Sequence, residues 1–278
     1  MSTSVFGVIT IGIDPTIELG PLTLAWHGFA IALGVLAGAW VAARYARERG
    51  LDPERVTSLV LIVALSGIVG ARFFYLAVAE PGALLRPQEW VGTTGFAFYG
   101  ALILAPIAVA LYLRRERLTP RYLDALAAGF PLGMAVGRIG DVINGEHYGP
   151  PSDLPWAFRY THPDADVPST VLAYHSGGFY EVVLALGMLA VVWPLRHRLR
   201  RPLMLLWAVI ALYGAGRFVM FFFRSDSEAL ALGLNEAQWT SLALMAAAAV
   251  GAWWSASHSD PTPSNDASRA RPKTRTAG

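Results

Sequence analysis

The chain has 278 residues and no cysteine, which excludes disulfides, a thiolate nucleophile of its own and cysteine-based metal sites. Apolar residues make up 54% of it and charged residues only 15%, against roughly 25% charged residues in a soluble domain. This composition excludes an ordinary soluble protein. The net charge of +2 gives no reason to expect nucleic acid as a partner.

Seven stretches have the roughly 20 mostly apolar residues that a transmembrane helix needs. They are residues 22–43, 56–78, 95–113, 122–138, 178–195, 202–223 and 238–255. The fourth is short, and a re-entrant or interfacial helix is the alternative there. The sequence therefore predicts an all-α polytopic membrane protein with seven transmembrane helices. We expect one transmembrane domain over residues 1–256, with a long outer loop region at 139–177, and a disordered cytoplasmic tail at 257–278.

The placement of basic residues predicts the orientation of these helices, because cytoplasmic connections carry an excess of Lys and Arg. Sixteen of the 22 basic residues fall on one side of a seven-helix arrangement, around residues 44–55, 114–121, 196–201 and 269–275. Only an odd number of spans gives this pattern. We therefore expect the N-terminus outside and the C-terminus in the cytoplasm.

The remaining basic residues lie on or near the outer side, where the topology rule does not explain them. Arg72, Arg217, His27 and Tyr99 are each predicted to lie roughly 6–9 Å below the outer surface, and Arg138 ends the fourth helix near that level. A charge inside the bilayer costs at least ~2.5–3.5 kcal/mol near the centre and marks a functional site by default. The alternative is that these arginines extend to lipid phosphates at the interface. Three arginines at one depth favour a site for an anionic lipid headgroup, since guanidinium binds phosphate through two parallel hydrogen bonds.

The most specific segment of the chain runs from residue 137 to residue 149. It resembles the signature Gly-Arg-x-Gly-Asn-Phe-x-Asn-x-Glu-x-x-Gly of the prolipoprotein diacylglyceryl transferases. The matching residues are Gly137, Arg138, Gly140, Asn144, Glu146 and Gly149.

Further similarities to this family follow in the same order over about residues 20–255. They are Trp26-His27-Gly28, Gly70-Ala71-Arg72, Pro155-Trp156-Ala157, His175 with Phe179-Tyr180-Glu181, and Tyr213-Gly214 with Arg217 and Phe222-Phe223-Arg224. The family moves the diacylglyceryl group of phosphatidylglycerol to the lipobox cysteine thiol of a prolipoprotein, forming a thioether. The resemblance implies this activity, no cofactor, and a multi-pass protein of the bacterial plasma (inner) membrane with its active site near the outer leaflet.

The resemblance also implies the site. The residues expected to carry the chemistry are Arg138, Arg217, His27, Tyr99 and Glu146. Those expected to bind substrate are Arg72, Asp141, Asn144, Gly149, His175, Tyr180, Glu181 and Tyr213.

The chain departs from the family pattern at several of these positions. The family has tyrosine at the position of His27, histidine at Tyr99, asparagine at Asp141 and glutamate at Phe221. Because the first two changes are reciprocal, we hypothesise that His27 and Tyr99 face each other near the arginines, with His27 replacing the missing histidine. An interfacial aromatic pair without chemistry is the alternative.

The reaction requires a holder for the phosphate and an acceptor for the thiol proton. Arg138 and Arg217 fit the first role, with Arg72 behind them. For the second role His27, Asp141, Glu146 and Glu181 remain open. The histidines of the outer loop have no helical i,i+4 ligand pair, so we predict no metal. The alternative function is a catalytically silent homologue that binds anionic lipid or lipoprotein precursors.

Overall fold

The computed structural model describes residues 7–20, 22–90, 95–225 and 228–258. The chain divides into two compact units, and the divisions fall inside helices α1 (Trp26–Glu48) and α4 (Arg121–Asn144). The first unit holds the described residues up to Val41 and those from Ala127 onward, and the second holds Ala42–Leu126.

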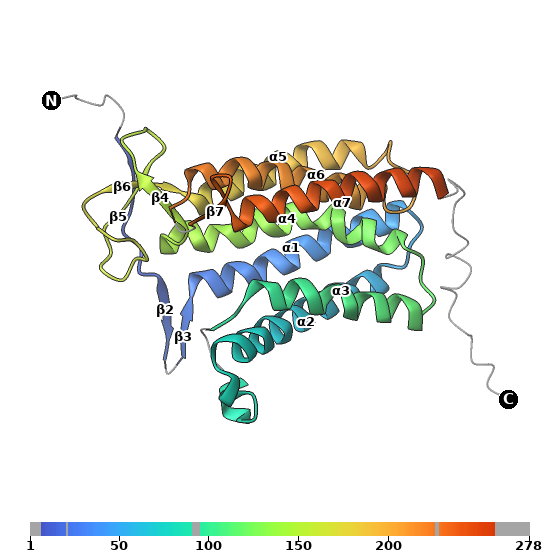
Figure 1. The fold of residues 1–278 in the computed structure, drawn as a ribbon, viewed down its shortest axis with the longest axis horizontal. Coiled ribbons are helices and arrows are strands. Elements are labelled where there is room, and N and C mark those ends of the chain that lie inside the picture. Colours follow the sequence, from blue (N-terminus) through green and yellow to red (C-terminus); the bar gives the residue numbers. More distant parts are fainter. Residues whose placement is uncertain (1–6, 21, 91–94, 226–227, 259–278) are drawn as a thin grey trace. The chain divides into compact units, whose positions relative to one another are not determined.

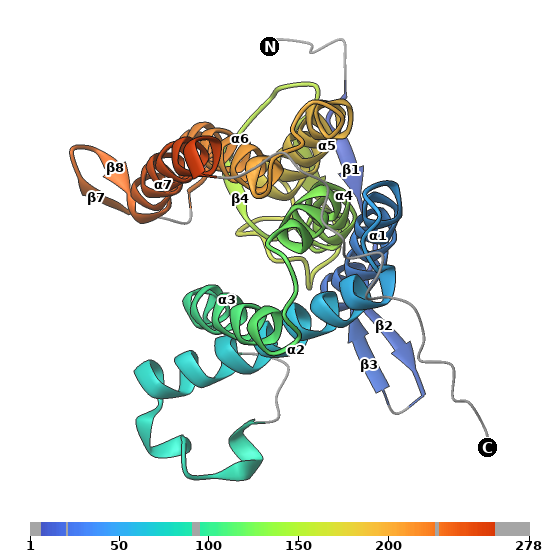
Figure 2. The same ribbon diagram turned by 90° about the vertical axis from the view of Figure 1, so that its right-hand side faces the viewer.

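Three further helices belong to the first unit. They are α5 (Gly177–Leu195), α6 (Met204–Met220) and α7 (Glu236–His258). Helix α6 packs between α5 and α7 (Figure 2), and a 3-10 turn, η3 (Phe221–Phe223), continues it.

The second unit is built on two helices that lie side by side, α2 (Pro53–Ala79) and α3 (Phe98–Arg115) (Figure 2). Asp52 caps the start of α2, where its side chain accepts a hydrogen bond from the Glu54 backbone at 2.9 Å, and Pro53 takes the first helical position. Two 3-10 turns, η1 (Pro81–Ala83) and η2 (Pro87–Trp90), follow α2.

The seven α-helices of the described residues lie close to the seven predicted ranges. By length and composition five can cross a membrane, namely α1, α2, α4, α5 and the run Met204–Phe223 that contains α6. The prediction of a mostly helical, polytopic membrane protein is thereby confirmed at this coarse level. Seven crossings and their orientation stay a prediction.

Short strands form at one end of the first unit, and the sequence did not predict them (Figure 1). A sheet has the order β1-β5-β6-β4. Its strands are β1 (Ile9–Ile11), β4 (Tyr148–Pro151), β5 (Phe158–Tyr160) and β6 (Ala173–Ser176). Strand β1 pairs in parallel with β5, and β6 is antiparallel to both of its neighbours.

Two hairpins complete the strands of the first unit, β2 (Thr16–Leu19) with β3 (Leu22–Ala25) and β7 (Ala229–Ala231) with β8 (Leu234–Asn235).

Helix α4 is the clearest difference between predicted and observed boundaries. The sequence predicts its end at Arg138, but the helix continues to Asn144. The sequence prediction puts Asp141 in the outer loop region, and Asp is in general a poor residue for a helix interior. In the structure its side chain is held by ion pairs on both oxygens, which leaves the backbone free to stay helical.

The predicted tail of residues 257–278 is described only at its start. Helix α7 includes residues 257 and 258, and residues 259–278 lie outside the described residues.

Candidate active site

Three arginines of the first unit converge on one buried carboxylate, Glu181. Ser176 caps α5 by accepting the Phe179 N–H at 3.2 Å, which places Glu181 in the second turn of that helix with 1% of its side chain exposed. Arg138 from α4 pairs through Nε with Glu181 Oε2, while the Nη1 atoms of Arg217 and Arg224 lie 3.8 Å and 3.3 Å from Oε1. A buried carboxylate is stable only when it is paired. Glu181 is therefore the point that holds three helix ends together.

Asp141 is the second buried carboxylate, one turn after Arg138 on α4 and also 1% exposed. Its Oδ2 accepts a hydrogen bond from Arg138 Nη1, and its Oδ1 lies 2.5 Å from His27 Nδ1. Residues three apart on a helix share a face, which explains the first contact. Arg138 thus links Glu181 to Asp141, and Asp141 links α4 to the start of α1.

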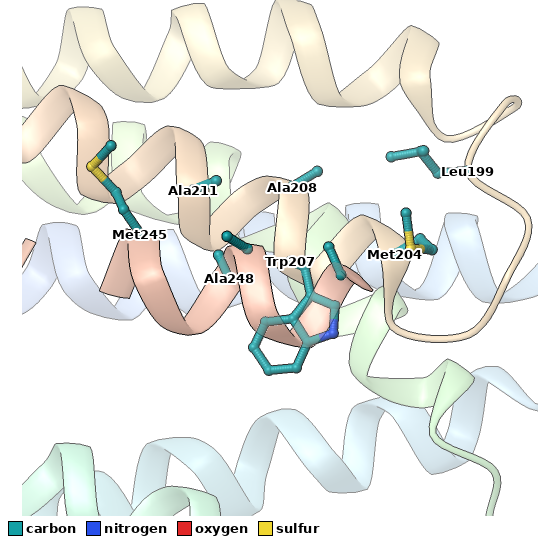
Figure 3. Close-up of a pocket in the computed structure, with 9 residues that line it drawn as sticks. Leu199, Met204, Trp207, Ala208, Ala211, Met245 and Ala248 are labelled. Carbon is teal, nitrogen blue, oxygen red and sulfur yellow. The ribbon is translucent and has the colours of Figure 1, made fainter. Parts of the chain in front are cut away.

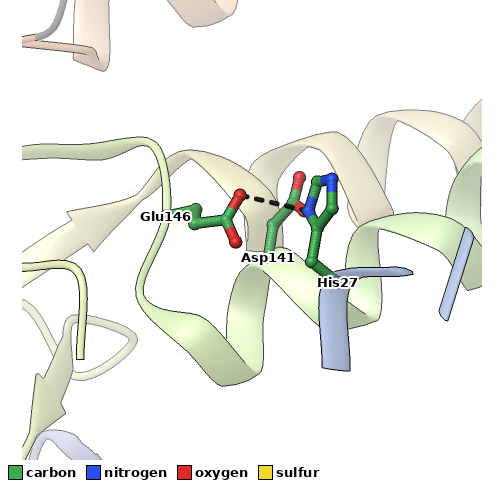
Figure 4. Close-up of side chains that lie close together, drawn as sticks. All are labelled: His27, Asp141 and Glu146. Atoms are coloured by element: carbon green, nitrogen blue, oxygen red, sulfur yellow. Dashed lines mark hydrogen bonds and ion pairs between the residues drawn. The ribbon is translucent and has the colours of Figure 1, made fainter. Parts of the chain in front are cut away.

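His27 lies between two carboxylates (Figure 4). Its Nδ1 atom is 2.5 Å from Asp141 Oδ1 and 3.1 Å from Glu146 Oε2. The close approach of α1 to α4 requires Gly140, where a Cβ would come within 2.6 Å of the His27 Cα atom. From the sequence we expected His27 to lie beside arginines. In the structure the groups in contact with its imidazole are the carboxylates of Asp141 and Glu146, because the first turn of α1 packs against the last turns of α4.

Glu146 follows the end of α4, and its carboxylate also accepts a hydrogen bond from Asn144 Nδ2 at 2.9 Å. Burial alone raises the pKa of this carboxyl, but the hydrogen bonds from His27 and Asn144 outweigh burial and lower it below its usual value. Glu146 is therefore ionised at neutral pH. Asn144 is buried, and its Oδ1 has no hydrogen-bond partner among the described residues.

The trio of His27, Asp141 and Glu146 has the residue types of a metal site, and its ligand atoms lie within 4.8 Å of one another. Ligands about 2.0–2.2 Å from a tetrahedral metal ion stand roughly 3 Å or more from each other. The 2.5 Å contact between His27 Nδ1 and Asp141 Oδ1 is shorter than that and is a hydrogen-bond distance. Arg138 also pairs with Asp141, which opposes a second cation. The geometry fits a hydrogen-bonded acid–base group, and the absence of a metal stays a prediction.

The remaining predicted residues of the first unit surround this cluster. The Tyr213 hydroxyl accepts a hydrogen bond from Arg217 Nη1 at 3.3 Å, one helical turn away on α6. His175 Nδ1 lies 2.5 Å from the Tyr180 hydroxyl, and both rings pack on Phe223. Gly149 lies in β4, where a Cβ would come within 2.0 Å of the Phe223 carbonyl oxygen. Only glycine fits there.

Two residues of the cluster were missed as site residues, Arg224 and His147. Besides its contact with Glu181, Arg224 lies with Nη2 2.8 Å from His147 Nδ1. A guanidinium always donates, so His147 Nδ1 accepts, and a neutral His147 carries its proton on Nε2. His147 also has a left-handed backbone, with φ of 61°. Arg224 was identifiable as one of the six basic residues that the topology rule left unexplained, whereas His147 was considered only as one of the outer-loop histidines that could bind a metal.

The second unit contains two predicted site residues, Arg72 and Tyr99. Arg72 is buried, and its guanidinium donates to the backbone carbonyls of Glu89 and Gly95, with Nε and Nη1 each at 2.9 Å. These contacts indicate that Arg72 holds the segment after α2 in place. The ring of Tyr99 lies 6.4 Å from that of Phe74. Because His27 and Tyr99 belong to different units, the hypothesis that they face each other stays a prediction.

An apolar groove on the first unit is separate from this cluster (Figure 3). It lies between α6 and α7 and is lined by Trp207, Ala208, Met245 and neighbouring alanines. Trp207 and Arg217 are ten residues apart on α6, about 15 Å along the helix. The groove contains no acid, base or anion-binding group, so the charged cluster is the candidate active site.

The chain is similar in sequence to proteins of one family. The sequence model of the prolipoprotein diacylglyceryl transferase family matches residues 15–254. A phosphatidylglycerol–prolipoprotein diacylglyceryl transferase from Thermosynechococcus vestitus is 35% identical over 247 residues, which cover 86% of this chain and 90% of the relative. The enzyme of the same name from Methylibium petroleiphilum is 34% identical over 258 residues, 86% of this chain and 95% of its own. The one from Symbiobacterium thermophilum is 34% identical over 233 residues, 78% of this chain and 83% of its own.

Proposed function

Because the chain belongs to the prolipoprotein diacylglyceryl transferase family, we propose that it transfers the diacylglyceryl group of phosphatidylglycerol to the lipobox cysteine of prolipoproteins. The cysteine sulfur attacks the glycerol carbon that bears the phosphate. A carbon–sulfur bond forms, the carbon–oxygen bond to phosphate breaks, and glycerol phosphate leaves with the electron pair. The products are a thioether-linked lipid and a soluble phosphate monoester.

The observation that carries this proposal is the way Arg217 is held. Its polar contacts with Tyr213 and Glu181 both use Nη1, and the described residues give no hydrogen-bond acceptor to its Nε or Nη2. The ring of Phe221 packs on the guanidinium face, with the central carbon 4.6 Å from the ring centroid. The edge bearing Nε and Nη2 is the one that binds a phosphate through two parallel hydrogen bonds. Charge that develops on the leaving phosphate is stabilised by this edge and by the nearby Arg138.

The proton of the thiol is assigned to His27. A thiol with a pKa near 8.5 is only a few per cent thiolate at neutral pH, so a base accelerates its attack. His27 Nδ1 donates to Asp141 and Glu146. These two carboxylates favour the imidazolium, so only the neutral form of His27, whose Nε2 carries a free lone pair, accepts the thiol proton. The carboxylates then stabilise the imidazolium that forms, as the aspartate does in a Ser-His-Asp triad.

The membrane orientation is part of the proposal. We place the charged cluster of Arg138, Arg217, Arg224 and Glu181 near the outer leaflet of a bacterial inner membrane, with all seven helices crossing. The reason is that three groups of four arginines, within residues 44–55, 114–121 and 196–201, lie at the opposite ends of the helices.

Asp164 and Arg198 test this orientation, since they lie before and after α5 and are both exposed. Because the chain has no cysteine, Asp164→Cys and Arg198→Cys each carry a single thiol. A membrane-impermeant maleimide added to intact spheroplasts should label the first variant and should reach the second only after the membrane is opened. Labelling of both thiols from the same side would contradict the orientation.

The activity itself is tested with purified protein, phosphatidylglycerol vesicles and a synthetic lipobox peptide. We expect a peptide product whose mass increases by one diacylglyceryl group, and no product with a peptide in which serine replaces the cysteine. Binding of lipid and peptide without any product would identify the chain as a silent member of the family and contradict the proposed function.

A further inference from the structure

The hairpin of β7 and β8 joins the charged cluster to α7 and exposes an apolar tip. Its sequence from residue 229 to 235 is Ala-Leu-Ala-Leu-Gly-Leu-Asn, without a charged residue. Leu230 is 73% exposed and Leu232 is 88% exposed. Single exposed leucines are common on protein surfaces, but here two of them stand at the tip of one small element.

The backbone of the tip makes Leu232 an unfavourable choice for its position. Leu232 and Gly233 form the turn, with φ of 51° and 73°. Two-residue turns of this kind favour Asn-Gly or Gly-Gly, because residues other than Gly, Asn and Asp strain the left-handed conformation. Leucine at this place strains the turn and also exposes apolar surface to water. Moving the side chain from water into an apolar phase removes the second disadvantage and offsets the first.

The hairpin is held firmly against the start of α7. Asn235 and Gln238 cap this helix reciprocally, with backbone-to-side-chain hydrogen bonds of 3.0 Å and 2.9 Å. One residue later Trp239 donates from its indole to the Ala231 carbonyl at 3.3 Å. These bonds couple the direction of the hairpin to the axis of α7.

The hairpin points sideways from the axis of α7. Figure 2 looks along the helices of the first unit, and in it the hairpin projects laterally from α7, on the side away from α6. If α7 crosses a membrane, such a hairpin lies along the membrane surface rather than standing up into water. A tryptophan at its base is typical of the interface.

We infer that the β7–β8 hairpin lies on the outer leaflet and inserts Leu230 and Leu232 among the lipid chains near the headgroups. The occupant of the apolar tip is thus the bilayer. Insertion is shallow, because the hairpin edges carry backbone groups that need water. The inference rests on the membrane orientation proposed above and extends it, since it adds a lipid contact in the segment between Arg224 and α7.

A depth measurement tests the inference without depending on transfer activity. Leu232→Cys in the full chain is labelled with an environment-sensitive fluorophore and reconstituted into phosphatidylcholine–phosphatidylglycerol vesicles that contain lipids with nitroxides at shallow or deep chain positions. We expect blue-shifted emission and loss of fluorescence with the shallow nitroxide. Asp164→Cys, in an exposed loop of the same unit, is the matched control and should emit as in water.

Water-like emission from residue 232, with no more quenching than at residue 164, would overturn the inference. A blue shift that occurs only after a lipobox peptide is added would also overturn it, because the tip would then contact the substrate. Quenching as expected but no thioether product would leave the hairpin inference standing and contradict the proposed function instead.

A second variant separates the lipid contact from folding. Leu232→Asn suits the left-handed turn better, so the melting temperature in detergent should be unchanged or higher. In the same background a fluorophore at Leu230→Cys should lose its quenching by the shallow nitroxide, whereas Leu232→Met should retain it. Unchanged quenching in the asparagine variant would show that the leucine has no part in lipid contact.

Discussion

Replacing Glu181 with glutamine should destabilise the protein and abolish most of its activity. The change leaves Arg138, Arg217 and Arg224 close together without the carboxylate that they share. Removing one partner of a buried ion pair costs about 3–5 kcal/mol, because the remaining charge stays buried and unpaired. The melting temperature in detergent should fall clearly, and transfer should fall by at least about tenfold, since a misplaced guanidinium no longer meets the phosphate.

Two further variants show whether the effect comes from the charge and its position. Glu181→Asp keeps the charge but shortens the side chain, so it should retain more stability than Glu181→Gln. Glu228→Gln removes an exposed carboxylate and should change neither the melting temperature nor the rate. A Glu181→Gln protein with a normal melting temperature and normal activity would show that Glu181 does not hold the three arginines in place.

The helices were the most predictable part of the fold. Residues 178–195 were predicted as a helix and α5 spans Gly177–Leu195, because a long apolar run bounded by polar residues has few alternatives. The signature around Arg138 predicted the family, and the comparisons confirm it. The unexplained outer arginines predicted a charged site, and in the first unit Arg138 and Arg217 do lie together with Arg224 around Glu181.

The small sheet could not be predicted from local patterns. Its strands have three or four residues and β4 contains two prolines, so neither length nor alternation distinguished them from a loop. One of the pairings joins distant parts of the chain, since β1 pairs with β5 about 150 residues later. Such long-range pairing leaves no local signal.

The residue that contacts His27 could not be predicted from the sequence either. The reciprocal change of tyrosine and histidine suggested Tyr99, which has the right predicted depth. Asp141, another departure from the family pattern, lies 2.5 Å from the imidazole. Depth along a helix places residues at one level but does not say which helices face each other. Because His27 and Asp141 contact each other, we predict that the two residues act as a pair.

A double-mutant cycle that restores the family residues tests this pairing. His27→Tyr alone removes the imidazole from Asp141 and Glu146, and Asp141→Asn alone removes the charge that holds both His27 and Arg138. Each loses a charge-assisted hydrogen bond, which is worth roughly 1.5–3 kcal/mol, or about a 10- to 100-fold loss of transfer. Melting temperatures measured alongside would separate loss of chemistry from loss of fold.

The combination His27→Tyr with Asp141→Asn recreates the family's tyrosine–asparagine pair. If the two residues act together, the double variant should be about twofold to 150-fold more active than the product of the two single effects, since residues in contact show coupling of roughly 0.5–3 kcal/mol. The matched cycle combines His27→Tyr with Tyr99→His, which restores the family residues at the other pair. If the effects at residues 27 and 99 are coupled and those at 27 and 141 are additive, Tyr99 and not Asp141 is the residue that acts together with His27. A functional pair at 27 and 141 requires their effects to be non-additive.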